Sequence, residues 1–214
     1  MTQDEFMRMV ADEMIRDLTS NAAIKKFADN TDVIGAYAEA GVRRFVERMM
    51  APARVSTGAV ISEKLCVNPK QVPQIDAIIW QPMPFIPIFE AGEFALVPSH
   101  SVLGILEIKR SCYSSVGAGI AEVIAREADL VAQVEGAQSN KHRKSMGVIC
   151  VREKDHGEKV LKELIESDKT VVLIDAQDGE IKADHVAVYK LIRFLMGLRS
   201  RMCELEGTSV ITIK

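Results

Sequence analysis

Apolar residues recur along the chain with two periods, and each period predicts one kind of element. Near the amino terminus they recur every three or four residues, the spacing that gathers side chains on one face of an α-helix. Farther along they alternate or run continuously over short stretches, which indicates β-strands. The pattern predicts, in chain order, helices over 4–19 and 32–50, strands over 55–64, 74–80 and 101–109, a helix over 115–135, a strand over 147–151, a helix over 158–167, a strand over 170–175, a helix over 183–204 and a strand over 208–213.

Strands and helices alternate after the second helix. Alternation of this kind is typical of α/β proteins, in which helices cover the faces of a sheet. The strand over 101–109 is apolar along nearly its whole length, so we expect it to be central and covered on both faces. The sequence therefore predicts a mixed central β-sheet flanked by helices. It forms one domain of 1–214, with a helical extension over 1–30 and a core over 31–214.

Two local features refine this outline. Thr2 and Glu5 stand three residues apart at the start of the first helix, the spacing of a capping box. The stretch 81–99 holds four prolines and three phenylalanines. Proline at this density predicts a long loop or loose hairpin and argues against a central strand. Its aromatic side chains either close over the core, which we favour, or form a contact surface.

Composition is that of an ordinary globular protein, with 48% hydrophobic and 27% charged residues in 214. There is no apolar run of about 18 residues, and the first residues lack the basic and then apolar pattern of a secretory signal. We therefore expect a cytoplasmic protein that does not enter a membrane. The four cysteines form no C-x-x-C pair, which gives no indication of a zinc knuckle or a redox motif.

The net charge of −3 argues against a protein that coats nucleic acid through a general positive field. One basic run, 141–144, interrupts this balance, and such a run is more typical of a solvated loop than of a phosphate-binding surface. No G-x-S-x-G, P-loop or G-x-G-x-x-G is present, and the histidines lack ligand spacing. These absences argue against serine hydrolases and nucleotide-driven enzymes.

Three charged residues mark the ends of two predicted neighbouring strands. Because side chains alternate along a strand, Glu107 and Lys109 point to one face while Ile108 points to the other. Asp76 joins them if its strand pairs with theirs. Two carboxylates that converge at a buried strand edge need a cation, which favours Mg²⁺ or Mn²⁺. The alternative is a plain ion pair between Glu107 and Lys109, with Asp76 incidental.

The run Pro73-Gln74-Ile75-Asp76, followed by Glu107-Ile108-Lys109, resembles the PD-(D/E)XK nuclease superfamily. The chain as a whole resembles an uncharacterised bacterial and phage branch of it. Two residues separate Pro73 from Asp76, so the literal Pro-Asp pair is absent. The preceding helix carries Glu39, similar in placement to a glutamate that joins the metal site in many members. The resemblance implies a restriction-endonuclease-like core and a nuclease-like domain.

The resemblance also implies roles for these residues. Asp76, Glu107 and the carbonyl of Ile108 would bind Mg²⁺ or Mn²⁺, and Glu39 would add a further ligand. Lys109 would orient the attacking water or offset charge in the transition state. Gln74 would be a hydrogen-bonding neighbour of the metal-bound water or of the substrate. The expected catalytic residues are thus Asp76, Glu107, Lys109, Glu39 and Gln74.

These observations predict a divalent-metal-dependent phosphodiesterase or nuclease that cleaves DNA by a metal-activated water. Its partner is nucleic acid, and a homodimer is possible because cutting both strands of a duplex takes two sites. The alternative is a non-catalytic nucleic-acid-binding or protein-interaction module of the same fold, which the acidic net charge favours. A different hydrolase on a similar sheet would need a nucleophile that the sequence does not offer.

Overall fold

The computed structural model describes residues 2–22, 31–61, 74–82, 86–134, 145–154, 156–176 and 182–205. Its elements follow one another along the chain much as the apolar pattern predicts. They are α1 (Gln3–Ala22), α2 (Thr31–Met50), β1 (Arg54–Ile61), β2 (Ile75–Trp80), β3 (Phe89–Ala91), β4 (Phe94–Pro98), a 3₁₀ turn (Ser99–Ser101), β5 (Val102–Ser111), α3 (Val116–Val134), β6 (Ser145–Arg152), α4 (Lys159–Glu166), β7 (Thr170–Asp175), β8 (Lys182–Ala183) and α5 (His185–Leu205). The strand expected over 208–213 lies outside the described residues.

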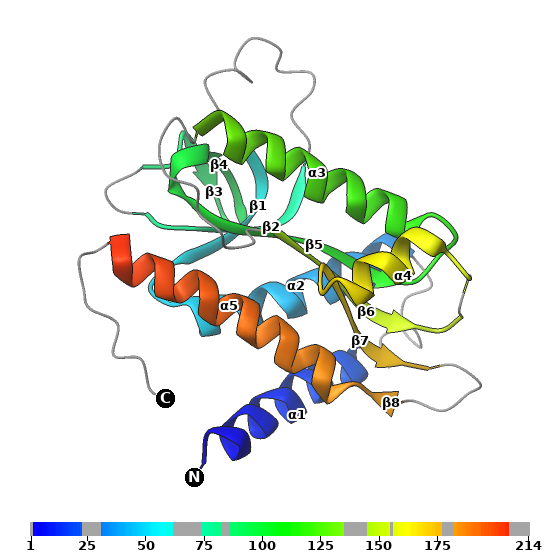
Figure 1. Ribbon diagram of the computed structural model, residues 1–214. Helices are drawn as coiled ribbons and strands as arrows, with labels where there is room; N and C mark the ends of the chain where they lie inside the picture. The colour runs from blue at the N-terminus through cyan, green and yellow to red at the C-terminus, as the bar shows by residue number, and fades with distance from the viewer. Residues whose placement is uncertain are drawn as a thin grey trace.

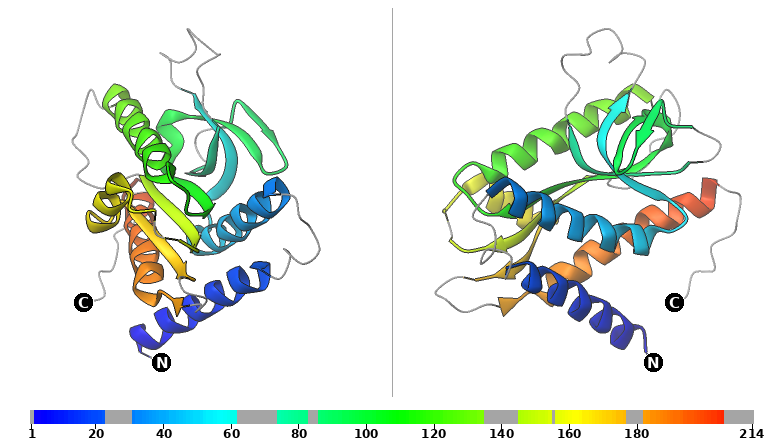
Figure 2. Two further views of the ribbon diagram at one scale, coloured as in Figure 1. Left: turned by 90° about the vertical axis from the view of Figure 1, so that its right-hand side faces the viewer. Right: turned by 180° about the vertical axis from the view of Figure 1, so that it is seen from behind.

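The strands form one mixed sheet with the order β3-β4-β1-β2-β5-β6-β7-β8. Helices α2 and α5 cover one face, with α1 packed outside them, and α3 and α4 cover the other (Figures 1 and 2). The central strand β5 touches both layers, as its apolar sequence predicts. The predicted mixed sheet flanked by helices is therefore confirmed. None of the described helices is long and apolar enough to cross a membrane.

The start of α1 has the predicted capping box. The Thr2 amide donates to Glu5 Oε2 at 2.7 Å, and the Glu5 amide donates to Thr2 Oγ1 at 3.2 Å. Each side chain thus satisfies a backbone donor that the first helical turn leaves without a partner. Past this turn, α1 buries Val10 and Met14 against α2 and α5.

The stretch 81–99 contains a hairpin of β3 and β4, which is one of the two predicted alternatives. The expectation that it holds no central strand is wrong, because β4 lies inside the sheet between β3 and β1. Proline does not prevent this, because Pro98 is the last residue of β4 and the other three prolines precede β3. The favoured expectation that the aromatics close over the core is also wrong for Phe89 and Phe94, which are 51% and 37% exposed.

Helix α3 approaches α4 so closely at Gly117 that a side chain has no room. A Cβ on Gly117 would lie 2.7 Å from the Leu161 amide nitrogen, whereas a Cβ on Gly119 would meet nothing within 4 Å. Gly117→Ala is expected to lower the free energy of unfolding by about 2 kcal/mol. Gly119→Ala, the matched control, is expected to raise it by about 0.7 kcal/mol through helix propensity. Urea denaturation measures both, and equal effects would contradict this packing.

Candidate active site

The site begins where β2 and β5 part. The two strands pair antiparallel, and their ladder ends at Ala77 opposite Leu106. One residue farther on, the Ile108 amide donates to Asp76 Oδ2 at 2.8 Å. A side-chain carboxylate therefore takes the place of a backbone carbonyl at this point, and the predicted pairing of these two strands is confirmed.

A β-bulge accounts for the direction of Asp76. In the pairing of β1 with β2, Ser56 faces Ile78 and Gly58 faces Ile75, so Thr57 alone faces two residues, Asp76 and Ala77. A bulge bends its strand and changes the direction of the side chain it carries, and such bulges are frequent beside active sites. The extra residue thus places the Asp76 carboxylate in the gap that opens toward β5.

Glu107 and Lys109 meet Asp76 in this gap. Ile108, between them in sequence, is fully buried in the core that α2 and α5 share, so its two neighbours point the other way. Lys109 Nζ lies 2.5 Å from Glu107 Oε1 and 3.6 Å from Asp76 Oδ2. The structure therefore brings together the three residues that the sequence singled out, with the ammonium group between two carboxylates.

The electrostatics of the cluster are those of a site with excess negative charge. Glu107 is only 7% exposed, and its Oε2 is buried with no hydrogen-bond partner among the described residues. Burial, and then the nearby Asp76 carboxylate, raise the pKa of Glu107. For Lys109, burial opposes the charge, but the bond to Glu107 and the charge of Asp76 prevail and raise the pKa of the ammonium group. Lys109 is therefore a cation at neutral pH.

Glu39 projects from α2 toward the same cluster without touching it. Its side chain is 31% exposed and lies 3.6 Å from Arg43. Burial, and then Asp76, raise the pKa of Glu39, while Arg43 and Lys109 act in the opposite direction. The influence of Asp76 and Lys109 on this carboxyl indicates that Glu39 lies near the cluster.

The Gln74 side chain reaches β1. Its amide nitrogen lies 3.4 Å from Thr57 Oγ1, and Thr57 in turn donates to the Ile75 carbonyl at 3.1 Å. Gln74 thus contacts β1 beside the bulge rather than the carboxylates. The basic run 141–144 lies outside the described residues.

Sequence reasoning overlooked Arg43, Thr57 and Glu93. Arg43 donates to the backbone carbonyl of Asp76 at 3.2 Å and to the Glu93 carboxylate at 2.9 Å. Its position four residues after Glu39, on the same face of α2, was the available signal. For Thr57 and Glu93 there was none, because both reach the site through strand register.

The residues present suit a hard divalent cation in their chemistry. In the described part of the chain, no three His, Cys, Asp or Glu side chains are grouped closely enough to hold a metal ion. The donor set nonetheless fits Mg²⁺ or Mn²⁺, because both prefer carboxylate oxygen and the buried Glu107 Oε2 has no hydrogen-bond partner in the described part of the chain. Asp76 and Glu107 are the two residues that would hold such an ion, with Glu39 next to them.

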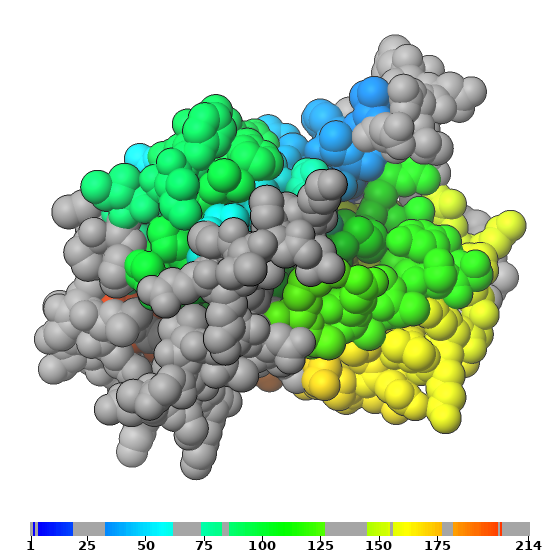
Figure 3. Space-filling view, turned by 90° about the horizontal axis from the view of Figure 1, so that it is seen from above, coloured from blue at the N-terminus to red at the C-terminus, as the bar shows by residue number. Residues whose placement is uncertain are grey.

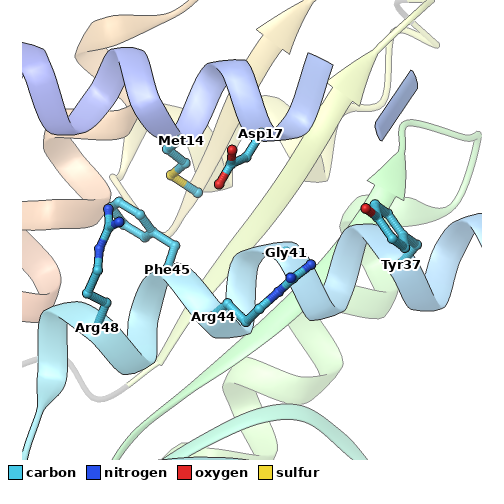
Figure 4. Close-up of a pocket in the computed structure, with 7 residues that line it drawn as sticks. All are labelled: Met14, Asp17, Tyr37, Gly41, Arg44, Phe45 and Arg48. Carbon is cyan, nitrogen blue, oxygen red and sulfur yellow. The ribbon is translucent and has the colours of Figure 1, made fainter. Parts of the chain in front are cut away.

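A pocket of about 350 Å³ lies elsewhere, between α1 and α2 (Figure 4). Its charges nearly cancel, because Arg48 forms a two-point ion pair with Glu13 and Asp17 lies across from Arg44. The pocket between α1 and α2 is lined by Met14, Asp17, Tyr37, Gly41, Arg44, Phe45 and Arg48.

A different face of the molecule is seen from above in Figure 3, where the start of α2 and the green residues of β5 and α3 border a recess.

No protein-family model and no curated protein matches this sequence. Among solved structures, the chain is similar to NucC from P. aeruginosa ATCC27853 in its cAAA-bound form, with a TM-score of 0.58, 10% identity and coverage of 95% of this chain and 99% of that chain. NucC from E. coli MS115-1 gives 0.58 with 12% identity in its cAAA-bound form, covering 97% and 92%, and 0.54 with 13% identity in its apo form, covering 99% and 95%.

These likenesses extend over nearly the whole chain. NucC has the PD-(D/E)XK fold. The chain therefore has a restriction-endonuclease-like fold, as the sequence predicted. At 10–13% identity, the likeness establishes the fold alone.

Proposed function

We propose that this protein is a divalent-metal-dependent phosphodiesterase that cleaves DNA. The observation that carries the proposal is the buried carboxylate of Glu107. One of its oxygens has no hydrogen-bond partner among the residues that the structure describes, and Asp76 lies next to Glu107 where two strands part. Burying negative charge in this way is costly unless a cation neutralises it. The restriction-endonuclease-like fold supports the same activity, because a nuclease is known on this fold.

The expected cation is Mg²⁺ or Mn²⁺, held by Asp76, Glu107 and the Ile108 carbonyl, with Glu39 as an additional ligand. When bound, it supplies an activated water and polarises the phosphate. Lys109 is protonated, so it acts through its charge rather than by accepting a proton. From its place between the two carboxylates, it is positioned to orient the attacking water and to offset the charge that grows on the phosphate oxygens. Gln74, on the β1 side, is proposed to contact the substrate.

We further propose that the chain works as one nuclease-like domain, with 1–30 as a helical extension of the core over 31–214. The shared apolar cluster of α1, α2 and α5 supports this arrangement.

A second copy of the chain is the proposed partner of the β3–β4 hairpin. Its Ile88 is 61% exposed, and Phe89 and Phe94 contact each other edge to face with ring centroids 6.4 Å apart.

Cleavage of plasmid and linear DNA by the purified chain tests the proposal. We expect nicking or cutting with Mg²⁺ or Mn²⁺ and none with EDTA. Because two of the NucC structures contain cAAA, each reaction is run with and without cAAA. Lys109→Ala, purified in the same way, is expected to lower the rate about 100-fold, which excludes a contaminating nuclease. Absence of cleavage in every arm, or full activity of Lys109→Ala, would contradict the proposal.

The second candidate is a non-catalytic module of the same fold that binds nucleic acid or a protein. One observation favours it, namely that Lys109 already neutralises part of the carboxylate charge. This candidate predicts that calorimetry detects no Mn²⁺ binding to the native chain. The nuclease proposal predicts binding that Glu107→Gln removes.

A further inference from the structure

Arg43 joins three elements beside the cluster. It stands on α2 one turn after Glu39, and its side chain is 12% exposed. Nη1 donates to the Asp76 carbonyl on β2 at 3.2 Å, and Nη2 donates to the Glu93 carboxylate before β4 at 2.9 Å. The Nε group is buried and has no partner among the described residues. Burying a guanidinium with one unbonded donor costs free energy. The two hydrogen bonds that Arg43 makes offset part of this cost.

The residue that Arg43 contacts is held from both of its ends. The Asp76 carbonyl accepts from Arg43, and the Asp76 carboxylate accepts from the Ile108 amide. Between these two bonds, the peptide and side chain of Asp76 have little freedom to rotate. Because Asp76 belongs to the bulge, regular pairing with β1 does not provide this restraint.

Glu93, the other partner of Arg43, is itself fixed to the bulge. Its carbonyl accepts from the Thr57 amide at 2.8 Å, and Thr57 is the residue of β1 that faces Asp76 and Ala77. The contacts therefore run from Arg43 through Glu93 to Thr57, which faces Asp76 across the pairing of β1 with β2. The planar fork of arginine reaches the two acceptors with separate nitrogens held in a fixed geometry, which the single nitrogen of lysine does not reproduce.

We propose that Arg43 is a positioning residue, which fixes the Asp76 peptide so that the Asp76 carboxylate stays bonded to Ile108 and beside Lys109. The catalytic consequence of this role rests on the proposed nuclease function, but the positioning itself does not. Arg43 acts through Asp76 and is not required to touch the substrate.

The first test uses the metal-free protein and needs no activity. Exchange of the Ile108 amide proton, followed by NMR, reports on its bond to the Asp76 carboxylate. Arg43→Gln is expected to speed this exchange at least about 10-fold. The matched control, Arg44→Gln, removes an exposed arginine of the same helix that donates to the Ala40 carbonyl of its own turn, and it is expected to leave exchange unchanged. Native exchange in Arg43→Gln would overturn the proposal.

The second test measures the consequence for the proposed reaction. Arg43→Gln is expected to weaken Mn²⁺ binding by about 10-fold in calorimetry and to lower kcat, with KM for DNA unchanged. A rise in KM with native Mn²⁺ affinity and native exchange would instead identify a substrate contact and overturn the proposal. If Arg43→Gln does not fold, Arg43→Lys serves in its place, since lysine keeps the charge but loses the fork. If the native chain neither binds Mn²⁺ nor cleaves DNA, the proposed function fails while amide exchange still decides the role of Arg43.

Discussion

Glu107→Gln is expected to lower metal-dependent DNA cleavage by at least about 1000-fold. The substitution keeps the size of the side chain and removes its charge. An amide cannot neutralise a divalent cation, and the substitution removes one of the carboxylate ligands proposed beside Asp76. Glu107 is almost completely buried, so a carboxylate from the protein surface cannot move into its place. The rate of plasmid nicking under single-turnover conditions measures the effect.

The same substitution is expected to stabilise the folded protein near neutral pH. Burial and Asp76 raise the pKa of Glu107 in the folded state, so the folded protein binds this proton more readily than the unfolded chain. The stabilising contribution of that proton is complete below the unfolded pKa and is lost as the pH rises through the folded pKa. At about pH 7, the native protein therefore carries a destabilising charge that glutamine lacks. We expect the free energy of unfolding to rise by about 1 kcal/mol, because functional sites commonly hold charges that lower the stability of the fold.

Denaturant unfolding at about pH 7 and about pH 4 separates this effect from general packing. The gain should shrink at the lower pH, where Glu107 binds its proton in both states. Glu122→Gln is the matched control, since Glu122 is exposed on α3 and pairs with Arg126 away from the site. A lower stability of Glu107→Gln than of the native protein near pH 7 would show that the bond to Lys109 outweighs the cost of burial.

Gly58→Ala is expected to destabilise the folded protein strongly. Gly58 has φ of +142°, and a Cβ there would lie 2.0 Å from the Ala95 carbonyl oxygen on β4. The clash is with backbone, so no side chain can move aside to relieve it. We expect a loss of about 3 kcal/mol or more, which corresponds to a fall in Tm of roughly 8 °C.

The control for this prediction is Gly92→Ala. Gly92 also has positive φ, +60°, but a Cβ on it would meet nothing within 4 Å. Its replacement is expected to cost only the backbone strain, about 1 kcal/mol. Differential scanning calorimetry of the two variants compares them, and equal losses would indicate that the contact with Ala95 is unimportant. Because Gly58 follows Thr57 at the bulge, Gly58→Ala is also expected to slow cleavage.

The sequence predicts most of the fold because the central elements have strong local patterns. The apolar run of β5 with charges only at its end indicates both its central place and the position of Glu107 and Lys109. The helical spacing in α2 similarly places Glu39 at the rim of a buried face. For these residues the local sequence pattern agrees with the tertiary structure, so the pattern alone predicts where they lie.

Long-range register explains what the sequence does not reveal. The position of β4 inside the sheet depends on its parallel pairing with β1, which no local signal encodes. Arg43 meets Glu93 only because the β3–β4 hairpin returns to the bulge. The bond from Ile108 to the Asp76 carboxylate likewise depends on where the β2–β5 ladder ends. Each of these contacts joins residues whose separation in sequence gives no periodic pattern.

The parallel ladders of this sheet also constrain how the chain folds. The pairs β1–β4, β5–β6 and β6–β7 are parallel, and each joins strands that other elements separate along the chain. Closing such loops loses chain entropy before the ladder contributes any hydrogen bonds, which slows the search for the transition state. The antiparallel β3–β4 hairpin and the helices have no such barrier and can form early. The gap that holds Asp76, Glu107 and Lys109 lies between β2 and β5, which the β3–β4 hairpin separates along the chain, so we expect this cluster to be completed late in folding.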